Sequence, residues 1–185
     1  MQNDFFRDDA WQRQVRDAIL VPQFYGSARF NGRYVLMDKG RCTSVIQRRL
    51  AVDTIVQSKA GGAVCIEEKI VRWPGYRYDS ICLETDSCTK PGLESEGWMR
   101  YGAADYLLYC FAQKNGDLDC WLIDFPALKS WFWPRYESFP QFGPLPTANA
   151  TRGRKVPLLA VRASVAHWQL YFRAFPAADS WEQIE

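Results

Sequence analysis

The order of the secondary-structure signals predicts an α/β domain in which helices flank a mixed central β-sheet. A helical pattern opens the chain, a run of strand-like segments follows, and helical and strand-like segments then alternate. Of the 185 residues, 48% are hydrophobic and 24% are charged, which is typical of globular rather than disordered proteins. At this length about 70% of the unfolded surface becomes buried, so we expect folding without disulfides or a structural metal ion.

The individual elements are predicted from apolar spacing and from turn residues. A first helix is expected over residues 3–20, where Val15, Ile19 and Leu20 recur at helical spacing. Segments rich in β-branched and aromatic residues between Gly and Pro turn signals predict strands. These segments are 34–37, 52–57, 63–71, 80–84, 106–111 and 119–125. Further short helices are expected over residues 94–101 and 127–132.

The chain changes composition after residue 133. Between residues 134 and 155, four prolines alternate with aromatic residues, which predicts an extended, aromatic-rich loop. A strand over residues 156–161 and a helix over residues 164–172 are expected to follow it. We therefore divide the chain into an α/β core (1–133) and a Pro- and aromatic-rich C-terminal extension (134–185) packed on that core.

Composition also limits the classes of function. The net charge of +2 and the single histidine, His167, neither demand nor exclude a nucleic-acid partner, but they exclude sites that need two histidines. The six cysteines form no C-x-x-C pair, and we interpret them as buried thiols in a reducing compartment. Neither a signal-peptide pattern nor an apolar run of about 20 residues is present, so we expect a soluble, cytoplasmic protein with no membrane partner.

The residues with the clearest chemical pattern are Asp53, Glu67 and Lys69. Asp53 begins one predicted strand, and Glu67 and Lys69 lie in the next one, across a Gly-rich turn. Two strands joined in this way pair antiparallel, and residues two apart in a strand share a face. The three side chains are therefore expected on one face, where the two carboxylates suit Mg²⁺ or Mn²⁺ and Lys69 can stabilise charge on a phosphate.

Asp53, followed fourteen residues later by Glu67-x-Lys69 across a hairpin, resembles the PD-(D/E)xK nuclease superfamily, which includes Holliday-junction resolvases and restriction-type and phage nucleases. The resemblance covers about residues 1–130 and implies a restriction-endonuclease-like core. It implies that Asp53, Glu67 and the backbone carbonyl of Glu68 bind the metal ion and that Lys69 is the catalytic lysine. Residues that the resemblance makes candidates for auxiliary roles are Asp8, Asp9, Gln47 and Glu84.

The motif departs from the family at its middle position, which is usually apolar and here is Glu68. Glu68 is expected to share a face with Ile66 and Ile70, which look like core residues. Either the strand end splays, or the Glu68 side chain is itself a ligand, or the motif is shifted. A plain alternative for the whole constellation is a solvated cross-strand ion pair.

Basic residues near and beyond the motif are candidates for binding DNA phosphates, because backbone neutralisation supplies most DNA affinity. These residues are Arg48, Arg49, Arg72, Arg77, Arg152, Arg154 and Lys155. Together these features predict a divalent-metal-dependent DNA endonuclease, with RNA as an alternative substrate and a homodimer as a candidate assembly. The competing hypothesis is a catalytically inactive protein of the same fold that regulates by binding nucleic acid or another protein.

Overall fold

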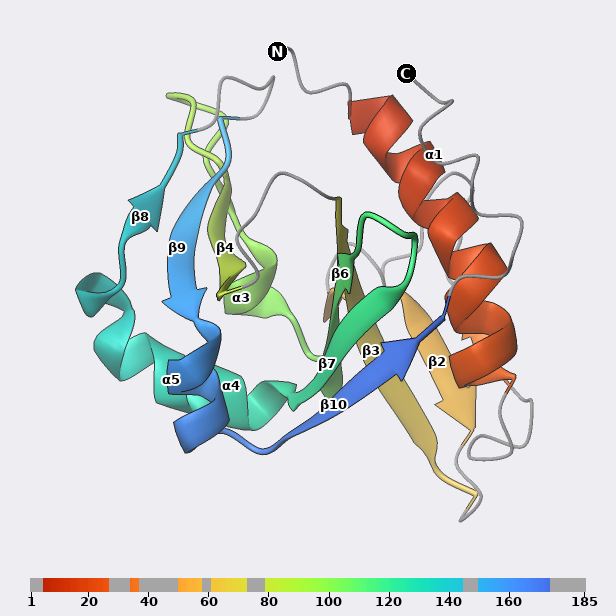
Figure 1. The fold of residues 1–185 in the computed structure, drawn as a ribbon. Helices are drawn as coiled ribbons and strands as arrows, with labels where there is room; N and C mark the ends of the chain where they lie inside the picture. Colours follow the sequence, from red (N-terminus) through yellow and green to blue (C-terminus); the bar gives the residue numbers. More distant parts are fainter. Residues whose placement is uncertain are drawn as a thin grey trace.

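The computed structural model describes residues 5–26, 34–36, 50–57, 61–72, 79–144 and 150–173, with the backbone alone described at 5–9 and 34–36. These residues form an α/β fold with two β-sheets and several helices (Figure 1). The helical segments are α1 (Phe5–Val15), η1 (Arg16–Tyr25), α3 (Trp98–Tyr101), α4 (Phe125–Phe132), η3 (Trp133–Ser138) and α5 (Leu158–Ser164). Within the described ranges, no helix is both long enough and apolar enough to cross a bilayer.

The larger sheet has six strands and is mixed, which confirms the predicted sheet type. In spatial order its strands are β1 (Tyr34–Leu36), β2 (Thr54–Gln57), β3 (Ala63–Val71), β6 (Tyr106–Ala112), β7 (Leu118–Asp124) and β10 (His167–Phe172). Neighbouring strands pair antiparallel, except that β3 and β6 run parallel. The antiparallel pairing of β2 with β3 is the arrangement that the sequence predicts around the candidate site.

A second, four-stranded sheet was not predicted. Its strands are, in spatial order, β5 (Ser95–Glu96), β4 (Ser80–Cys88), β9 (Arg152–Pro157) and β8 (Gln141–Phe142). Strand β4 was expected to continue the central sheet, but it pairs with β9 from the far end of the chain. Short-range signals predict that a segment is a strand, whereas its partner depends on contacts distant in sequence.

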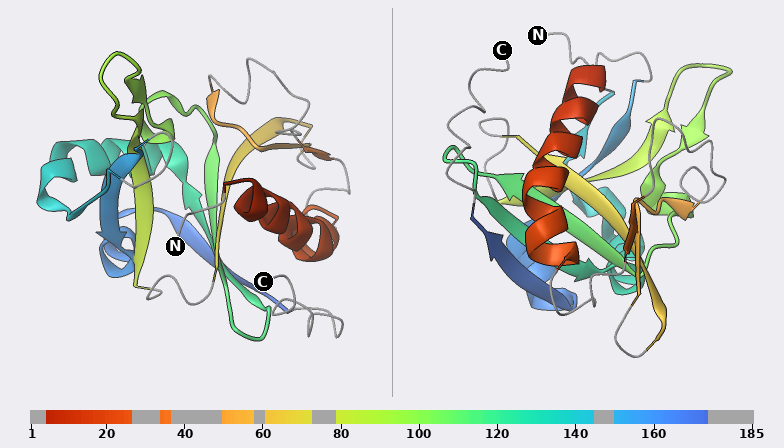
Figure 2. Two further views of the ribbon diagram at one scale, coloured as in Figure 1. Left: turned by 90° about the horizontal axis from the view of Figure 1, so that it is seen from above. Right: turned by 90° about the vertical axis from the view of Figure 1, so that its right-hand side faces the viewer.

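Two hydrophobic cores lie on opposite faces of the larger sheet, which has α1 on one side and the second sheet on the other (Figure 2). On one face, α1 and η1 cover side chains such as Ile66, Leu108 and Cys120. On the other, the second sheet and helices α3, α4 and α5 pack on side chains such as Leu107 and Ile123. The successive residues 107 and 108 of β6 therefore enter different cores, as the alternation of a strand buried on both faces requires.

Local sequence accounts for the start of α4. The Asp124 side chain accepts a hydrogen bond from the backbone N–H of Ala127 (2.8 Å), and Pro126 occupies the first turn. An aspartate cap and a proline whose missing N–H needs no partner both favour a helix start. This helix confirms the one predicted over residues 127–132.

The helix predicted over residues 164–172 is wrong, because this segment contains strand β10. Its even-numbered residues face the core under α1 and η1, where Leu170 and Phe172 pack. The odd-numbered His167 instead stacks on Trp121 on the other face, with ring centroids 5.1 Å apart. Short apolar segments fit either periodicity, and pairing with β7 decides in favour of the strand.

The described cysteines Cys65, Cys82, Cys88, Cys110 and Cys120 are all free thiols. Two of them, Cys110 and Cys120, are buried and face each other across β6 and β7 with their sulfur atoms 2.7 Å apart. Among the described cysteines the expected free thiols are confirmed, but the expected burial is not general, because Cys65, Cys82 and Cys88 are half-buried.

Candidate active site

Strands β2 and β3 bring Asp53 and Glu67 together. Thr54 pairs with Ile66, and the preceding Asp53 extends the ladder, because its N–H donates to the Ile66 carbonyl (2.9 Å). One step further along the antiparallel register, Asp53 lies opposite Glu67. The two carboxylic residues are only 2% and 4% exposed, respectively. Such burial of acids is rare in proteins unless the charge is compensated.

Lys69 supplies a positive charge to the same face. Its ammonium group donates a hydrogen bond to Glu67 Oε1, and its Nζ lies 5.1 Å from the centroid of the Trp98 ring. Trp98 comes from α3 on the side opposite α1, so these contacts place Lys69 and Glu67 on the face covered by the second sheet. The ion pair and the cation–π contact together restrict the lysine head group.

Carboxylates determine the ionisation of Lys69. Burial alone lowers the pKa of this ammonium, but Glu67, Asp53 and Glu84 outweigh burial and raise the pKa well above its ordinary value. The Lys69 ammonium is therefore positively charged near neutral pH beside these carboxylates. Glu84 on β4, an auxiliary candidate from the sequence, thus contributes to the field at the site.

Tyr101 at the end of α3 is a site residue that sequence analysis missed. Burial raises the pKa of its phenol, and the negative charges of Glu67, Glu84 and Asp53 raise it further, against the opposing effect of Lys69. The phenol is therefore protonated near neutral pH and is available to donate a hydrogen bond. The signal available in the sequence was weak. Trp98 and Tyr101 lie three residues apart, and residues at this spacing share one face of a helix.

The Glu68 side chain lies on the opposite face of β3. Its Oε1 accepts hydrogen bonds from the hydroxyls of Tyr25 (2.5 Å) and Thr54, and its Oε2 is 4.0 Å from Arg16 Nη1. Burial and the charge of Asp53 raise the pKa of Glu68, while Thr54, Tyr25 and Arg16 partly offset the rise. Of Glu68, only the backbone carbonyl therefore remains as a candidate ligand beside Glu67.

The donor set fits a hard divalent cation in part. Mg²⁺ is commonly held by one or two carboxylates, with water and substrate oxygens completing six positions. Asp53 and Glu67 provide two buried carboxylates on one face. Among the described residues, no group of three or more Asp, Glu, Cys or His side chains is arranged to hold a metal ion. An ion at this site would be held by two carboxylates and the Glu68 carbonyl, with water or substrate oxygens as its other ligands.

The backbone before Asp53 is strained. Ala51 has φ +46° and is 3% exposed, and for a residue with a Cβ this left-handed conformation costs about 1–2 kcal/mol. Strain of this kind is maintained by its surroundings and concentrates at functional sites. Here the neighbouring carbonyl of Leu50 accepts a hydrogen bond from Ala103 N–H (2.7 Å), which ties the segment to the start of β6.

We expect Ala51→Gly to leave the free energy of unfolding unchanged or to raise it by up to about 1 kcal/mol, because glycine adopts positive φ without a steric penalty. Thermal and urea unfolding provide the measurement. Ala104→Gly is the control, since Ala104 is equally buried and has no positive φ, and it should lose about 1 kcal/mol. An equal loss in both variants would contradict the assigned backbone conformation.

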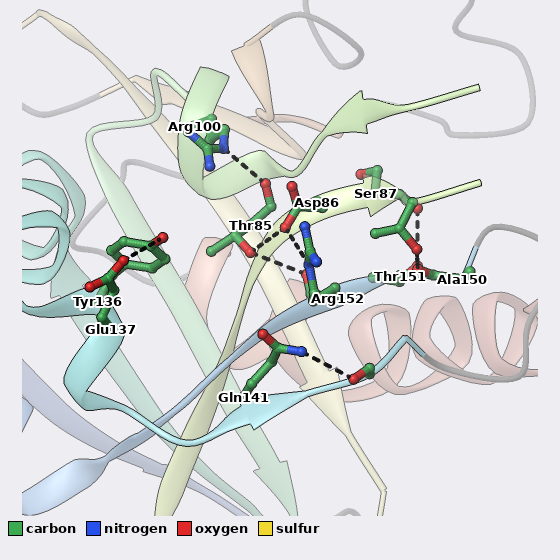
Figure 3. Close-up of polar contacts among 12 residues, drawn as sticks. Thr85, Asp86, Ser87, Arg100, Tyr136, Glu137, Gln141, Ala150, Thr151 and Arg152 are labelled. Carbon is green, nitrogen blue, oxygen red and sulfur yellow. Dashed lines mark hydrogen bonds and ion pairs between the residues drawn. The ribbon is translucent and has the colours of Figure 1, made fainter. Parts of the chain in front are cut away.

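The described candidates for binding nucleic acid do not form one cluster, because they lie at the end of β3 and along β9. Arg72 leaves the end of β3 and stacks on Trp11 of α1, 4.5 Å from the ring centroid. On β9, Arg152 pairs with Asp86 (3.1 Å; Figure 3). Arg154 donates to the Phe139 carbonyl (3.0 Å).

Arg152 is the basic candidate that contacts the strand carrying Glu84. It pairs with Asp86, two residues beyond Glu84 on β4. It also lines a cavity of about 350 Å³ together with Arg100 of α3. Arg100 donates to the Thr85 carbonyl (3.3 Å), as Figure 3 shows. Lys155, by contrast, is exposed and lines another cavity, of about 760 Å³, with Arg162.

Several predicted site residues cannot be placed. Gln47, Arg48, Arg49 and Arg77 lie outside the described residues, as do the side chains of Asp8 and Asp9.

Comparison of the chain with family models, with curated proteins and with solved structures gave no significant match.

Proposed function

We propose that this protein is a divalent-metal-dependent nuclease that hydrolyses phosphodiester bonds in DNA. The observation that carries the proposal is the convergence of Asp53, Glu67 and Lys69 on one face of two adjacent strands, with both acids buried. A merely solvated cross-strand ion pair would not explain acids that are only 2% and 4% exposed. The resemblance to PD-(D/E)xK nucleases supports the same assignment through the same three residues.

In this proposal Asp53, Glu67 and the Glu68 carbonyl bind Mg²⁺ or Mn²⁺. When bound, such an ion activates water as a nucleophile and neutralises charge on the phosphate. Lys69, whose ammonium lies beside Glu67, would orient the attacking water and stabilise negative charge that develops on the phosphate. Trp98 holds the lysine head group in place, and the protonated Tyr101 can donate a hydrogen bond to a substrate oxygen.

Arg100 and Arg152 are suited to contact DNA phosphates on the Glu84 side of the site, because arginine forms directional hydrogen bonds with phosphate oxygens. Their cavity also contains Asp86, Glu94 and Glu96, so these contacts would fix the position of a strand rather than supply strong net attraction. The remaining described candidates, Arg72, Arg154 and Lys155, would contact backbone farther from the site. Duplex cleavage by two copies in a homodimer is part of the same proposal.

The second candidate function is an inactive nuclease-like protein that binds nucleic acid or another protein. The observation that favours it is the direct ion pair between Lys69 and Glu67, which occupies both groups in the absence of metal. An active enzyme requires the ion to displace Lys69 from the Glu67 oxygen or to use its other oxygen. The two functions therefore differ in whether a divalent ion competes with this ion pair.

The test is a cleavage assay with supercoiled plasmid and Mg²⁺ or Mn²⁺, in which we expect nicked product from the wild-type protein. Asp53→Asn is the matched variant, because its amide oxygen can still accept from the Glu68 N–H (2.9 Å in the wild type) while the charge is lost. We expect no product from this variant or with EDTA. DNA binding without cleavage by either protein would favour the inactive protein, and equal cleavage by both would overturn the assignment of Asp53.

A further inference from the structure

We propose that Glu68, held by Tyr25 and Thr54, is a positioning residue that fixes Asp53 against Glu67 for metal binding. The inference rests on the proposed metal site and adds to it a second layer on the opposite face of the sheet. It explains why the middle position of the motif is a buried glutamate rather than an apolar residue. We call the Tyr25, Thr54 and Glu68 side chains the rear clamp.

The rear clamp is built from two hydroxyl donors and one carboxylate oxygen. Tyr25 at the end of η1 and Thr54 at the start of β2 both donate to Glu68 Oε1. Tyr25 and Thr54 are fully buried, and Glu68 is 5% exposed. Hydrogen bonds to a carboxyl oxygen in such a buried environment are strong and directional, so the clamp joins η1, β2 and β3 at one point.

The clamp is connected to the acids through the backbone. Thr54 directly follows Asp53, and the Glu68 N–H donates to Asp53 Oδ2 (2.9 Å). Glu68 also directly follows Glu67. Each clamp residue on the two strands is therefore the immediate neighbour of a proposed ligand and points to the other face. A shift of Thr54 relative to Glu68 would therefore also move the backbones of the two proposed ligands relative to each other.

This arrangement matches what hydrogen-bonded supports do for metal ligands. Partners that orient ligating groups typically affect metal affinity or activity by about 10–100-fold when removed. A purely structural role predicts instead that loss of the clamp lowers the free energy of unfolding and leaves the metal Kd of the folded protein unchanged. Metal affinity measured on folded protein therefore separates the two roles.

The test uses variants that each delete one donor and little volume: Thr54→Val, Tyr25→Phe and the double variant. Mn²⁺ affinity is measured by isothermal titration calorimetry, at a temperature where circular dichroism shows that every variant is folded. Thr89→Val is the matched control, because its hydroxyl donates to the Ala150 carbonyl (2.8 Å) at the far end of β4. Thr54→Ser, which keeps a donor hydroxyl, is the conservative variant.

We expect each single variant to weaken Mn²⁺ binding about 10-fold and the double variant up to about 100-fold. Thr54→Ser should recover most of the affinity, and Thr89→Val should bind as the wild type does. Unchanged Kd values in the folded clamp variants would overturn the inference while leaving the metal site intact. A wild-type protein that binds no Mn²⁺ would overturn the proposed function, and the inference with it.

Discussion

Glu67→Gln is expected to abolish metal-dependent cleavage, with a rate loss of about 10³-fold or more. The side chain keeps its size and one carbonyl oxygen, but it loses the charge that attracts the divalent ion. Stabilisation of the transition state by a catalytic metal ion is worth several kcal/mol, and about 4 kcal/mol corresponds to this loss in rate. The measurement is single-turnover cleavage of a labelled duplex with saturating protein and Mn²⁺.

The control for Glu67→Gln is Glu137→Gln, which makes the same chemical change at an exposed position of η3. It should cleave at the wild-type rate. Because Lys69 still interacts with Asp53 and Glu84, we expect Glu67→Gln to remain folded. Cleavage by folded Glu67→Gln at more than a tenth of the wild-type rate would contradict the role of Glu67 as a metal ligand.

Lys69→Met is expected to reduce the cleavage rate by about 10²–10³-fold, the usual effect of removing one group that stabilises transition-state charge. Methionine retains an apolar stem against Trp98 but removes the ammonium. Metal binding should persist, because Lys69 is a neighbour of the ion rather than a ligand. The rate is measured with saturating DNA and Mn²⁺, so that the loss refers to the chemical step.

Lys69→Met has a second expected signature, in thermal stability. Without the ammonium, the buried Asp53 and Glu67 repel each other, and the melting temperature without metal should fall below that of the wild type. Mn²⁺ binds only the folded site and should raise the melting temperature of this variant. Lys114→Met, in the exposed β6–β7 turn, controls for the change in net charge. Absence of a rise with millimolar Mn²⁺ would contradict shared ion binding by the two acids.

The part of the site within the hairpin was predictable from sequence because it depends on local rules. Period-two alternation places Glu67 and Lys69 on one face and Glu68 on the other. A short connection between two strands gives antiparallel pairing, which brings Asp53 opposite Glu67. The structure has this antiparallel pairing. The alternation that places Glu68 between apolar neighbours also directs its side chain to Tyr25 and Thr54.

The surroundings of the hairpin were not predictable, because they depend on contacts distant in sequence. Trp98 and Tyr101 come close to Lys69 only because the chain leaves β3, builds β4 in another sheet and returns through α3 to β6. Tyr25 lies beyond the predicted end of the first helix at residue 20, since η1 continues through Pro22 to Tyr25. A proline usually ends a helix, which is why Tyr25, one of the two donors of the clamp, was missed.

The most direct test of the central claim is a crystal structure of the wild-type protein soaked in Mn²⁺, with the ion located by its anomalous scattering. The account predicts one strong peak within about 2.0–2.3 Å of an oxygen of Asp53 and an oxygen of Glu67, with Lys69 beside it. A Mn²⁺ peak at another place, or an intact Lys69–Glu67 ion pair with no ion between the acids at millimolar Mn²⁺, would contradict it.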